Sequence, residues 1–366
     1  MADLSDVDRA RWRALLVHHP DTAPFVDEAW VAAWIQGFEP RQPLLACLWD
    51  EDALVGLGAL QRVTESWAGR RVAVLQSLTN VESPRFEFLS AYCRHDVQER
   101  LCRGLCEAGG CDVIRLEYLP EHSPTLRAAT QVAGERGWKH VIEETFESPW
   151  RSLRRPPAAW DEGLHRKFKA NLRNRERRLH ELGEVTFTVV RDGPAQHAAL
   201  ELFYALEASS WKGARGSAIR QRARARTFYD ALAALTAGET WIPTLSVSGR
   251  TVAAQLIRAH GRTLFMLKTA YDPAFAPYAP GQLLTGRVMR YGGEQGFDAL
   301  DFLGENMVWK SDWAPRLRRH YCLLLFSPSA RGRYAYWTRH GLRAQLKKIP
   351  YARQVVRWLR ARWARQ

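Results

Sequence analysis

The sequence predicts an α/β (α+β) protein with two successive halves, each a mostly antiparallel mixed sheet flanked by helices, and a basic C-terminal helix. Three observations support this class. The 366 residues exceed the usual length of a single domain. Helix and strand patterns recur in a similar α-β-β-β-α-β-α-β order in both parts, and a proline- and arginine-rich segment, SPWRSLRRPPAAW, separates them. We therefore expect one domain at residues 1–150, a second at 151–330 and a basic tail at 331–366.

The first half begins with a predicted helix in PFVDEAWVAAWIQGF, where apolar residues recur at helical spacing. The run PLLACLWDEDALVGLGALQRV predicts two strands joined at Asp50-Glu51-Asp52, which is a hairpin signal. Alternating apolar residues and terminal glycines predict the elements that follow. They are a strand in RVAVLQSL, a helix in HDVQERLCRGLCEAGG, a strand in DVIRLEYL, a helix in TLRAATQVAGERG and a strand in WKHVIEETF.

The second half begins with a basic helix, GLHRKFKANLRNRERRLHELG, that ends at Gly183. A strand in EVTFTVV and helices in PAQHAALELFYALEASS and TFYDALAALTAG follow. Three strands joined by tight turns at Ser248-Gly249-Arg250 and His260-Gly261-Arg262 predict an antiparallel meander. After the meander come a proline-rich loop, a helix in LLTGRVMRYGGEQGF, a strand in FDALDFL and a final strand in YCLLLF.

Composition and motif spacing exclude several classes of protein. No apolar run reaches the roughly 18 residues of a membrane span, and the charged N-terminus MADLSDVDRARW lacks the apolar core of a secretory signal. We therefore expect a cytoplasmic protein. The six cysteines include no C-x-x-C pair. Cys102 and Cys106 allow a metal pair on one helix face, but reduced, buried thiols are the favoured interpretation, and no metal site is expected.

The net charge of +14 is unevenly distributed. Residues 1–150 carry 15 basic and 23 acidic side chains, whereas the remainder carries 38 basic and 16 acidic ones. A basic second half indicates a polyanionic partner, such as a phosphorylated cofactor, RNA or an anionic membrane surface. In the tail, Pro350 can begin a helix with an apolar face and several arginines. This helix either docks on the acidic first half or holds the protein at the inner face of a membrane.

The loop YDPAFAPYAPGQLL, residues 271–284, connects the meander to the next helix. Pro280 is suited to a first helical turn, and Gly281 has no Cβ, so an anion can approach the backbone closely. Free N–H groups at a helix N-terminus bind phosphate. We therefore predict a pyrophosphate on the backbone of residues 278–283. The alternative is a solvent-exposed Pro-Gly turn.

Several motifs occur in an order that resembles a known family. They are FKANLRNRERRLHELGEVTF, FYALEASSWKGARGSAI, VAAQLIRAHGRTLFMLKTAYDPAFAPYAPGQLL and DFLGENMVWKSDWAP. Together they resemble the GNAT acetyltransferases and, more closely, the CelD-type acetyltransferases associated with cellulose biosynthesis, which are relatives of the FemABX transferases. The resemblance covers residues 165–315 and implies two tandem GNAT-like domains, the second being the acyltransferase domain.

The resemblance also implies an activity. The chain would be an acyl-CoA-dependent N- or O-acyltransferase with acetyl-CoA or another acyl-CoA as co-substrate and a small-molecule or glycan acceptor, such as a sugar or amino compound. Trp211 and Lys212 would lie over the acceptor pocket. The implied cofactor contacts are Leu267, Thr269, Tyr278, Ala279, Pro280, Gly281, Gln282 and Leu283.

Acyl transfer requires that the acceptor lose a proton, that the thioester oxygen be stabilised and that the thiolate leave. Asp301 ends a strand and is the candidate base, the alternative being a cap of the next turn. Tyr271 can protonate the thiolate, or it is a half-buried structural tyrosine. Lys310 can steady an oxyanion or a phosphate, or it is an ordinary exposed lysine. No G-x-S-x-G motif or Cys–His pair indicates a covalent intermediate, so we expect direct transfer in a ternary complex.

Two motifs depart from the family. Ala279 stands where the family usually has serine, and Glu305-Asn306 with Trp309-Lys310 replace the usual acidic pair and Tyr-Lys. Two other functions therefore stay open. One is a FemABX-like transferase that takes its aminoacyl group from charged tRNA. The other is a catalytically inactive adaptor in envelope polysaccharide biosynthesis.

Overall fold

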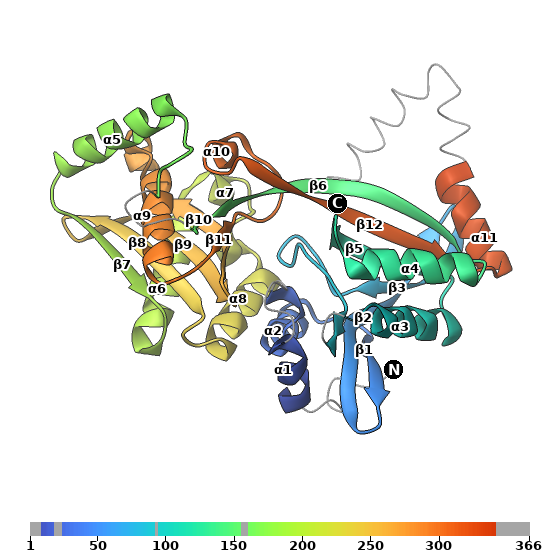
Figure 1. Cartoon of the computed structure of the whole chain (residues 1–366). Coiled ribbons are helices and arrows are strands. Elements are labelled where there is room, and N and C mark those ends of the chain that lie inside the picture. Colours follow the sequence, from blue (N-terminus) through green and yellow to red (C-terminus); the bar gives the residue numbers. More distant parts are fainter. Residues whose placement is uncertain (1–8, 18–23, 92–93, 155–159, 342–366) are drawn as a thin grey trace, which may run out of the picture.

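The computed structural model describes residues 9–17, 24–91, 94–154 and 160–341. Figure 1 shows two lobes joined by two long strands, β6 and β12, which are paired with each other along their length. The basic helix expected from Pro350 lies outside the described residues. In the described ranges, no helix combines the length and the apolar character that crossing a membrane requires.

The predicted helices and strands of the first half are present. The Asp27 carboxylate caps α2 by accepting a 2.6 Å hydrogen bond from the backbone N–H of Trp30. Ser123 caps α4, which begins at Pro124. The elements of this half are α1 (Arg9–Val17), η1 (Pro24–Val26), α2 (Glu28–Phe38), β1 (Pro43–Asp50), β2 (Ala53–Trp67), β3 (Arg70–Ser77), β4 (Leu89–Ser90), α3 (His95–Glu107), β5 (Val113–Pro120), α4 (Pro124–Glu135) and β6 (Lys139–Ser152).

The second half contains the predicted antiparallel meander, β8-β9-β10. Its first turn places Ser248 and Gly249 at φ 47° and 78°, the left-handed region that suits a tight hairpin. The elements are α5 (Arg166–His180), β7 (Val185–Val190), α6 (Gly193–Ser209), α7 (Trp211–Ala214), η4 (Ile219–Gln221), α8 (Ala223–Leu235), β8 (Thr240–Val247), β9 (Arg250–His260), β10 (Thr263–Tyr271), η5 (Pro273–Tyr278), α9 (Pro280–Glu294), β11 (Ala299–Asp301), α10 (Val308–Ser311), β12 (Arg316–Phe326), α11 (Ala330–Tyr336) and η6 (Trp337–Gly341).

A single mixed sheet runs through both halves in the strand order β1-β2-β3-β5-β12-β6-β11-β10-β9-β8-β7, with β4 paired to β2. Neighbouring strands are antiparallel except for β3–β5 and β10–β11, which are parallel. Each half therefore repeats an antiparallel meander followed by one parallel pair. The predicted α/β fold with a mostly antiparallel mixed sheet flanked by helices is confirmed.

The two halves exchange strands at the centre of this sheet. The last strand, β12, lies between β5 and β6 of the first half, and the end of β6 pairs with β11 of the second. The linker expected at residues 148–160 is therefore wrong for its first part, Ser148–Ser152, because those residues pair with β11 and β12. Removing either half would leave strands of the other without a partner.

The largest hydrophobic core also belongs to both halves. Trp30 of α2 is fully buried, and its ring lies 5.2 Å from that of Phe228 of α8. Helices α2 and α8 approach closely at Gly37, where an added Cβ would lie 2.5 Å from the Phe228 Cβ. Only glycine permits this contact. The indole N–H of Trp30 donates a 3.1 Å hydrogen bond to Ser83, in the loop between β3 and β4 that reaches the second half.

Candidate active site

The turn between β10 and α9 is shaped by its own side chains. Asp272 follows the last residue of β10, and its carboxylate accepts a 2.9 Å hydrogen bond from the backbone two residues later, which begins η5. Ala279 then takes a left-handed conformation with φ 47°, and Pro280 begins α9. The backbone N–H groups of Gln282 and Leu283 both donate to the Ala279 carbonyl, at 2.9 and 3.2 Å. Those two N–H groups are therefore already bonded within the turn.

Gly281 holds the remaining donor of this turn. In the described residues its backbone N–H has no hydrogen-bond acceptor. An added Cβ at Gly281 would lie 3.7 Å from Tyr271 Cδ1 and 3.8 Å from Thr269 Oγ1, which are ordinary contact distances. The first turn of α9 thus faces the end of β10 and offers an N–H there. A helix N-terminus with an unbonded donor attracts negative charge.

The edge of β10 on the side of β11 is largely open. Strand β11 pairs with β10 only at Thr263–Phe265, and in the described residues no strand pairs on that side farther along β10. The register with β9 shifts between Met266 and Lys268, which leaves Leu267 as a β-bulge. Bulges free a backbone group and are frequent beside active sites. Strands β10 and β11 therefore enclose a wedge whose β10 wall runs from the bulge to Tyr271.

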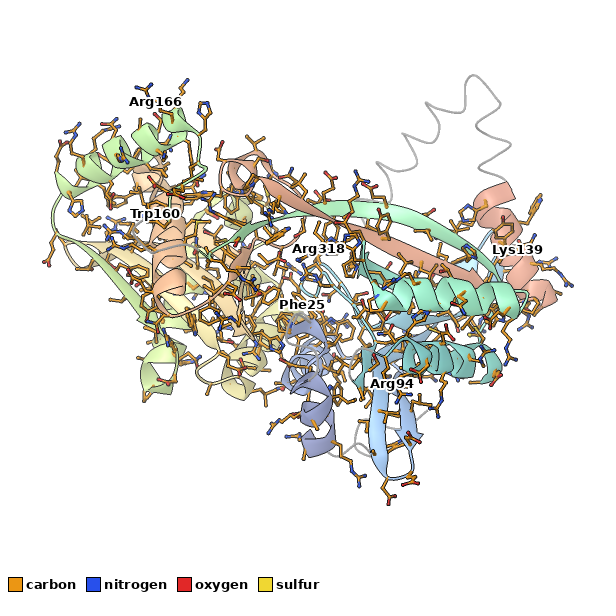
Figure 2. All side chains as sticks on the ribbon, in the orientation of Figure 1. Phe25, Arg94, Lys139, Trp160, Arg166 and Arg318 are labelled. Atoms are coloured by element: carbon orange, nitrogen blue, oxygen red, sulfur yellow. The ribbon has the colours of Figure 1, made fainter. Side chains whose placement is uncertain are left out.

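Asp301, the candidate base, lies at the narrow end of this wedge and is 2% exposed. Its Oδ2 accepts 2.8 Å hydrogen bonds from Arg85 and Arg318, and its Oδ1 accepts bonds from the Leu303 N–H at 3.0 Å and the Ser148 hydroxyl at 3.3 Å. Arg318 lies between the two lobes in Figure 2. Burial opposes ionisation, but the two arginines outweigh it and hold the pKa of Asp301 at about 2. With its oxygens occupied, Asp301 serves as an anchor more readily than as a base.

A second buried carboxylate, Glu82, stands beside the bulge. It comes from the first half, and its side chain is completely buried. Oε2 lies 2.7 Å from Lys268 Nζ and accepts a 2.7 Å bond from the Tyr229 hydroxyl, while Oε1 accepts a 2.8 Å bond from Arg222. Burial would raise the pKa of Glu82, but Lys268, Tyr229 and Arg222 lower it to about 2. This cluster ties the first half to the bulged part of β10.

Lys310 is buried against the loop that follows β11. Its ammonium donates to the carbonyls of Leu303 at 2.6 Å and Glu305 at 3.0 Å. Burial lowers the pKa of Lys310 from 10.5 to about 8, and the charges of Lys268 and Lys212 add to this effect. Lys310 is therefore close to its titration point near neutral pH, and its present contacts are with backbone carbonyls.

Lys212 reaches the open edge of β10 from α7. Its ammonium lies 2.8 Å from the buried carboxylate of Glu207 and donates to the Thr269 carbonyl at 3.4 Å. Trp211 beside it is 52% exposed. An added Cβ at Gly213 would lie 1.7 Å from the Ala208 carbonyl oxygen, so this tight turn between α6 and α7 requires glycine. The sequence Trp-Lys-Gly thus places a cation and an aromatic ring beside the wedge.

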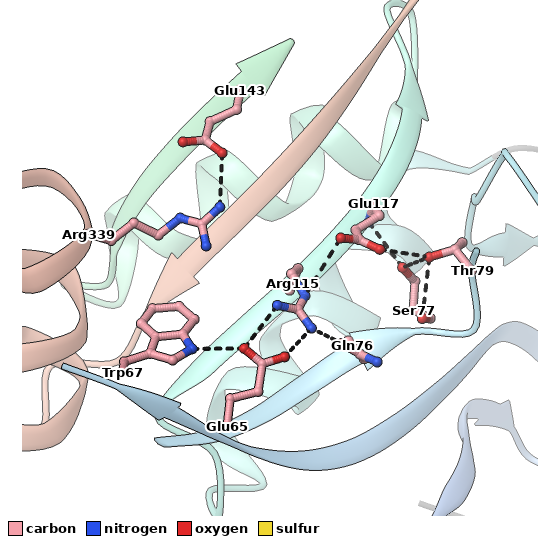
Figure 3. A network of polar contacts seen from close by, with 9 residues as sticks. All are labelled: Glu65, Trp67, Gln76, Ser77, Thr79, Arg115, Glu117, Glu143 and Arg339. Atoms are coloured by element: carbon pink, nitrogen blue, oxygen red, sulfur yellow. Dashed lines mark hydrogen bonds and ion pairs between the residues drawn. The ribbon is translucent and has the colours of Figure 1, made fainter. Parts of the chain in front are cut away.

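The corresponding parallel pair of the first half is closed by side chains. Figure 3 shows Arg115 of β5 between Glu65 and Glu117, with a 2.5 Å contact to Glu65. The Ser77 hydroxyl accepts a 3.0 Å hydrogen bond from the Glu117 N–H, and Thr79 donates to the Glu117 carboxylate at 3.3 Å. These bonds bridge β3 and β5 where the two strands separate. Only the wedge of the second half is therefore open in this way among the described residues.

The structure brings many of the predicted site residues together. Thr269, Tyr271 and Gly281 surround the open end of the wedge, with Leu267 at the bulge and Lys212 on the edge. Tyr278, by contrast, packs under Arg178, whose guanidinium lies 5.1 Å from the ring centroid. Sequence reasoning missed the residues that support the wedge from elsewhere, because no local pattern marks them. They are Glu82, Arg85, Arg222, Lys268 and Arg318.

Part of the chain is similar to a known protein family. Residues 166–311 match the family model described as acetyltransferase (GNAT) domain. No curated protein matches the chain. The crystal structure of FemX is similar, with 12% identity, a TM-score of 0.62 and coverage of 88% of this chain and 96% of that one.

Two further structures have the same fold. One is the C-terminal domain of a putative lysylphosphatidylglycerol synthetase from Agrobacterium fabrum, with 11% identity, a TM-score of 0.55 and coverage of 91% of this chain and 95% of that one. The other is a conserved protein of unknown function from Bacteroides thetaiotaomicron, with 13% identity, a TM-score of 0.58 and coverage of 87% and 98%. At identities of 11–13%, these similarities show that the chain shares the fold of the three structures. The chain therefore contains an acetyltransferase (GNAT) domain at residues 166–311, and it is an acyltransferase.

Proposed function

We propose that the chain transfers an acyl group from acyl-CoA directly to an amine or hydroxyl of a polar acceptor. The observation that carries this proposal is the open edge of β10, which begins at the Leu267 bulge and ends opposite the unbonded N–H of Gly281. The amides of a pantetheine chain can add to an open strand edge as a further strand would. The pyrophosphate then meets the N-terminus of α9.

The same geometry supports each chemical step. The thioester carbonyl lies beside the bulge, where the Leu267 N–H is a candidate donor to the developing oxyanion. The acceptor nitrogen or oxygen attacks the carbonyl carbon, the C–S bond breaks, and the electron pair leaves with sulfur. The Tyr271 hydroxyl, at the end of the same strand, gives its proton to the thiolate and regains one from the acceptor through solvent. Trp211 and Lys212 hold the acceptor from the opposite side.

The acceptor is a sugar, glycan or amino compound, and a role in envelope polysaccharide biosynthesis follows from the CelD-type resemblance of residues 165–315. Lys212 and Lys268 lie near Lys310, and their charges add to the effect of burial, which lowers the pKa of Lys310. A positive centre of this kind favours a neutral or anionic acceptor over a cationic one. We also propose that the basic tail, residues 331–366, holds the protein at the inner face of a membrane.

One observation favours aminoacyl-tRNA as an alternative donor of the acyl group. Helix α5 carries seven lysine or arginine residues and one acidic residue, Glu176. Such a helix can contact an RNA backbone, and two of the similar structures are FemX and a domain of a putative lysylphosphatidylglycerol synthetase. The alternative is therefore an aminoacyl-tRNA-dependent transferase. A gel shift with charged tRNA at physiological salt, with coenzyme A as competitor, separates the two donors.

The proposed function is tested by calorimetry with coenzyme A. Gly281→Val adds a branched side chain next to the free N–H without a clash, since a Cβ there has only ordinary contacts. Coenzyme A binding should weaken at least tenfold, which corresponds to about 1.4 kcal/mol. Gly293→Val is the matched control, because it lies in the same helix and its Cβ would meet only the Leu153 carbonyl at 3.8 Å. Equal coenzyme A affinity in both variants and the wild type would disprove the donor site.

A further inference from the structure

Strand β12 carries two arginines, Arg316 and Arg318, that no step of the proposed acyl transfer uses. Arg316 lies opposite Trp150 of β6, and Trp150 lies opposite Asp301 of β11. Residues directly opposite one another in antiparallel strands have their side chains on the same face. Arg318 lies opposite Ser148, two residues farther along each strand, and therefore shares this face. One face of the sheet thus carries both arginines beside the carboxylate at the narrow end of the wedge.

Trp150 orients both guanidinium groups. The Cζ atoms of Arg316 and Arg318 lie 5.1 and 5.6 Å from the centroid of its ring. Stacking on an aromatic ring restricts the plane of a guanidinium. Arg318 also donates a 2.8 Å hydrogen bond to Asp301. Arg316 is exposed, and in the part of the chain that the structure describes no carboxylate lies within ion-pair distance of it. The pair therefore includes an oriented guanidinium whose N–H groups are available to a ligand.

Positive charge exceeds negative charge around this pair. Among the described residues, Asp301 is the single carboxylate in contact with these arginines, and Arg85 and Arg318 share it. His320, next to Arg85, adds no charge at neutral pH, because burial and the charge of Arg85 lower the pKa of His320 to about 3. Two guanidinium groups on one ring repel each other. An anion bound to both would offset that repulsion, and the planar guanidinium matches phosphate and carboxylate groups.

The arginine pair lies on the side of the sheet opposite the proposed donor site. Leu300 precedes Asp301 in β11, and successive side chains of a strand point to opposite faces. Leu300 packs in the core that includes Leu284 and Val288 of α9. Asp301 and the arginines therefore face away from α9, whose first turn is the proposed pyrophosphate site. Figure 2 places Arg318 between the two lobes.

Lys310 connects the arginine pair with the wedge. It lies close enough to Asp301, Lys268 and Lys212 for their charges to influence its pKa, which burial lowers to about 8. Lys212 in turn donates to the Thr269 carbonyl at the open edge of β10. Basic side chains therefore continue from the open edge of β10, past Asp301, to β12.

We propose that Arg316 and Arg318 bind a phosphate or carboxylate group of the acceptor and so select an anionic acceptor. The inference rests on the proposed function and narrows its acceptor to an anionic sugar or amino compound. The donor then occupies the side of α9, and the acceptor occupies the opposite face. Its amine or hydroxyl points to the wedge and its anionic group to β12.

The experiment measures binding of three amino sugars to the full chain by calorimetry. Glucosamine 6-phosphate carries a phosphate, muramic acid carries a carboxylate, and glucosamine carries neither. The wild type should bind one or both anionic sugars about tenfold more tightly than glucosamine, as one charge-assisted contact implies. Arg316→Gln should remove this preference and leave glucosamine binding unchanged. The exposed side chain of Arg316 makes this substitution compatible with folding.

Arg319→Gln is the matched control. Arg319 is exposed on the same strand, but alternation places it on the opposite face, where it lies 3.4 Å from Glu147. This variant should keep the preference for the anionic sugars.

Chemical modification provides a readout that does not depend on the choice of sugar. Phenylglyoxal reacts with arginine side chains, and mass spectrometry of peptides measures its reaction at each position. Inorganic phosphate should slow the reaction of Arg316 in the wild type and leave that of Arg319 unchanged.

Three results would overturn the inference while the proposed function stands, as long as the wild type binds coenzyme A. They are equal binding of the three sugars, an unchanged preference in Arg316→Gln, and equal protection of Arg316 and Arg319 by phosphate. If the wild type does not bind coenzyme A, the proposed function fails, and the acceptor role of the arginine pair fails with it. Calorimetry with coenzyme A therefore separates the two failures.

Discussion

Replacing Asp301 with asparagine distinguishes two roles for the carboxylate at the end of β11. In the structure it is a buried acceptor held by Arg85 and Arg318, whose guanidinium nitrogens both lie 2.8 Å from the same oxygen. Asparagine keeps the shape and removes the negative charge. Arg85, whose side chain is 8% exposed, then stays buried beside Arg318 without a counter-charge.

The size of the effect follows from the pKa of Asp301, which is lowered from 3.8 to about 2 in the folded protein. That difference corresponds to about 2 kcal/mol of stability at neutral pH. Removing one partner of a buried ion pair lowers the free energy of unfolding by about 3–5 kcal/mol in other proteins. We therefore expect Asp301→Asn to lower it by about 3 kcal/mol. Because the folded pKa is depressed, this stability is present above pH 3.8 and is lost as pH falls towards 2. The difference in the free energy of unfolding between wild type and variant should therefore decrease as the pH falls from 3.8 towards 2.

Urea unfolding followed by tryptophan fluorescence measures this difference at pH 7 and pH 3. Asp298→Asn is the matched control, since Asp298 lies just before β11 and also contacts two arginines, Arg154 and Arg262, but those arginines are largely exposed. Exposed ion pairs contribute little, so the control should unfold almost as the wild type does. If Asp301→Asn is as stable as the control but has lost turnover, the carboxylate is the base and the structural argument is refuted.

Three other predictions concern folding. Gly213→Ala should lower the melting temperature clearly, because its Cβ would overlap the Ala208 carbonyl, whereas Gly104→Ala, with open space around it, should not. The free energy of unfolding of the wild type should rise by about 3 kcal/mol between pH 8 and pH 10.5, because the pKa of Lys310 is lowered to about 8 in the folded protein. Lys310→Met should abolish this rise. Urea titrations at both pH values test it. A chain that ends at residue 315 lacks β12 and should lose cooperative unfolding by calorimetry, since β5 and β6 then have no partner between them.

The local parts of the fold were predictable because short-range chemistry determines them. The turns at Ser248-Gly249 and His260-Gly261 define the meander, and Pro280 with Gly281 mark the start of α9. The position of β12 was not predictable. Its CLLLF run suits any buried strand, and its pairing with β5 and β6 depends on contacts across most of the chain. Long-range pairing has no signature in a single strand's pattern.

In the candidate site, too, residues in local motifs could be predicted and residues that depend on long-range contacts could not. Tyr271, Gly281 and Lys212 could be proposed from the sequence because each stands in a recognisable loop or turn. Glu82 and Arg85 were missed because they lie in the segment VESPRFEF of the other half, which carries no helix, strand or site motif. Both side chains are buried instead. A buried charge becomes visible only with its partners, and those partners are more than a hundred residues away in the chain.

These two side chains explain why the first half is needed although its own parallel pair is closed. Glu82 holds Lys268, which borders the bulge at one side of the wedge, and Arg85 holds Asp301, which ends β11 at the other. One short loop therefore fixes both strands that bound the proposed donor site. A carboxylate and a guanidinium that are fully desolvated keep their partners only in a narrow geometry. The first half thus has a positional role: it sets the separation of β10 and β11, which bound the proposed donor site.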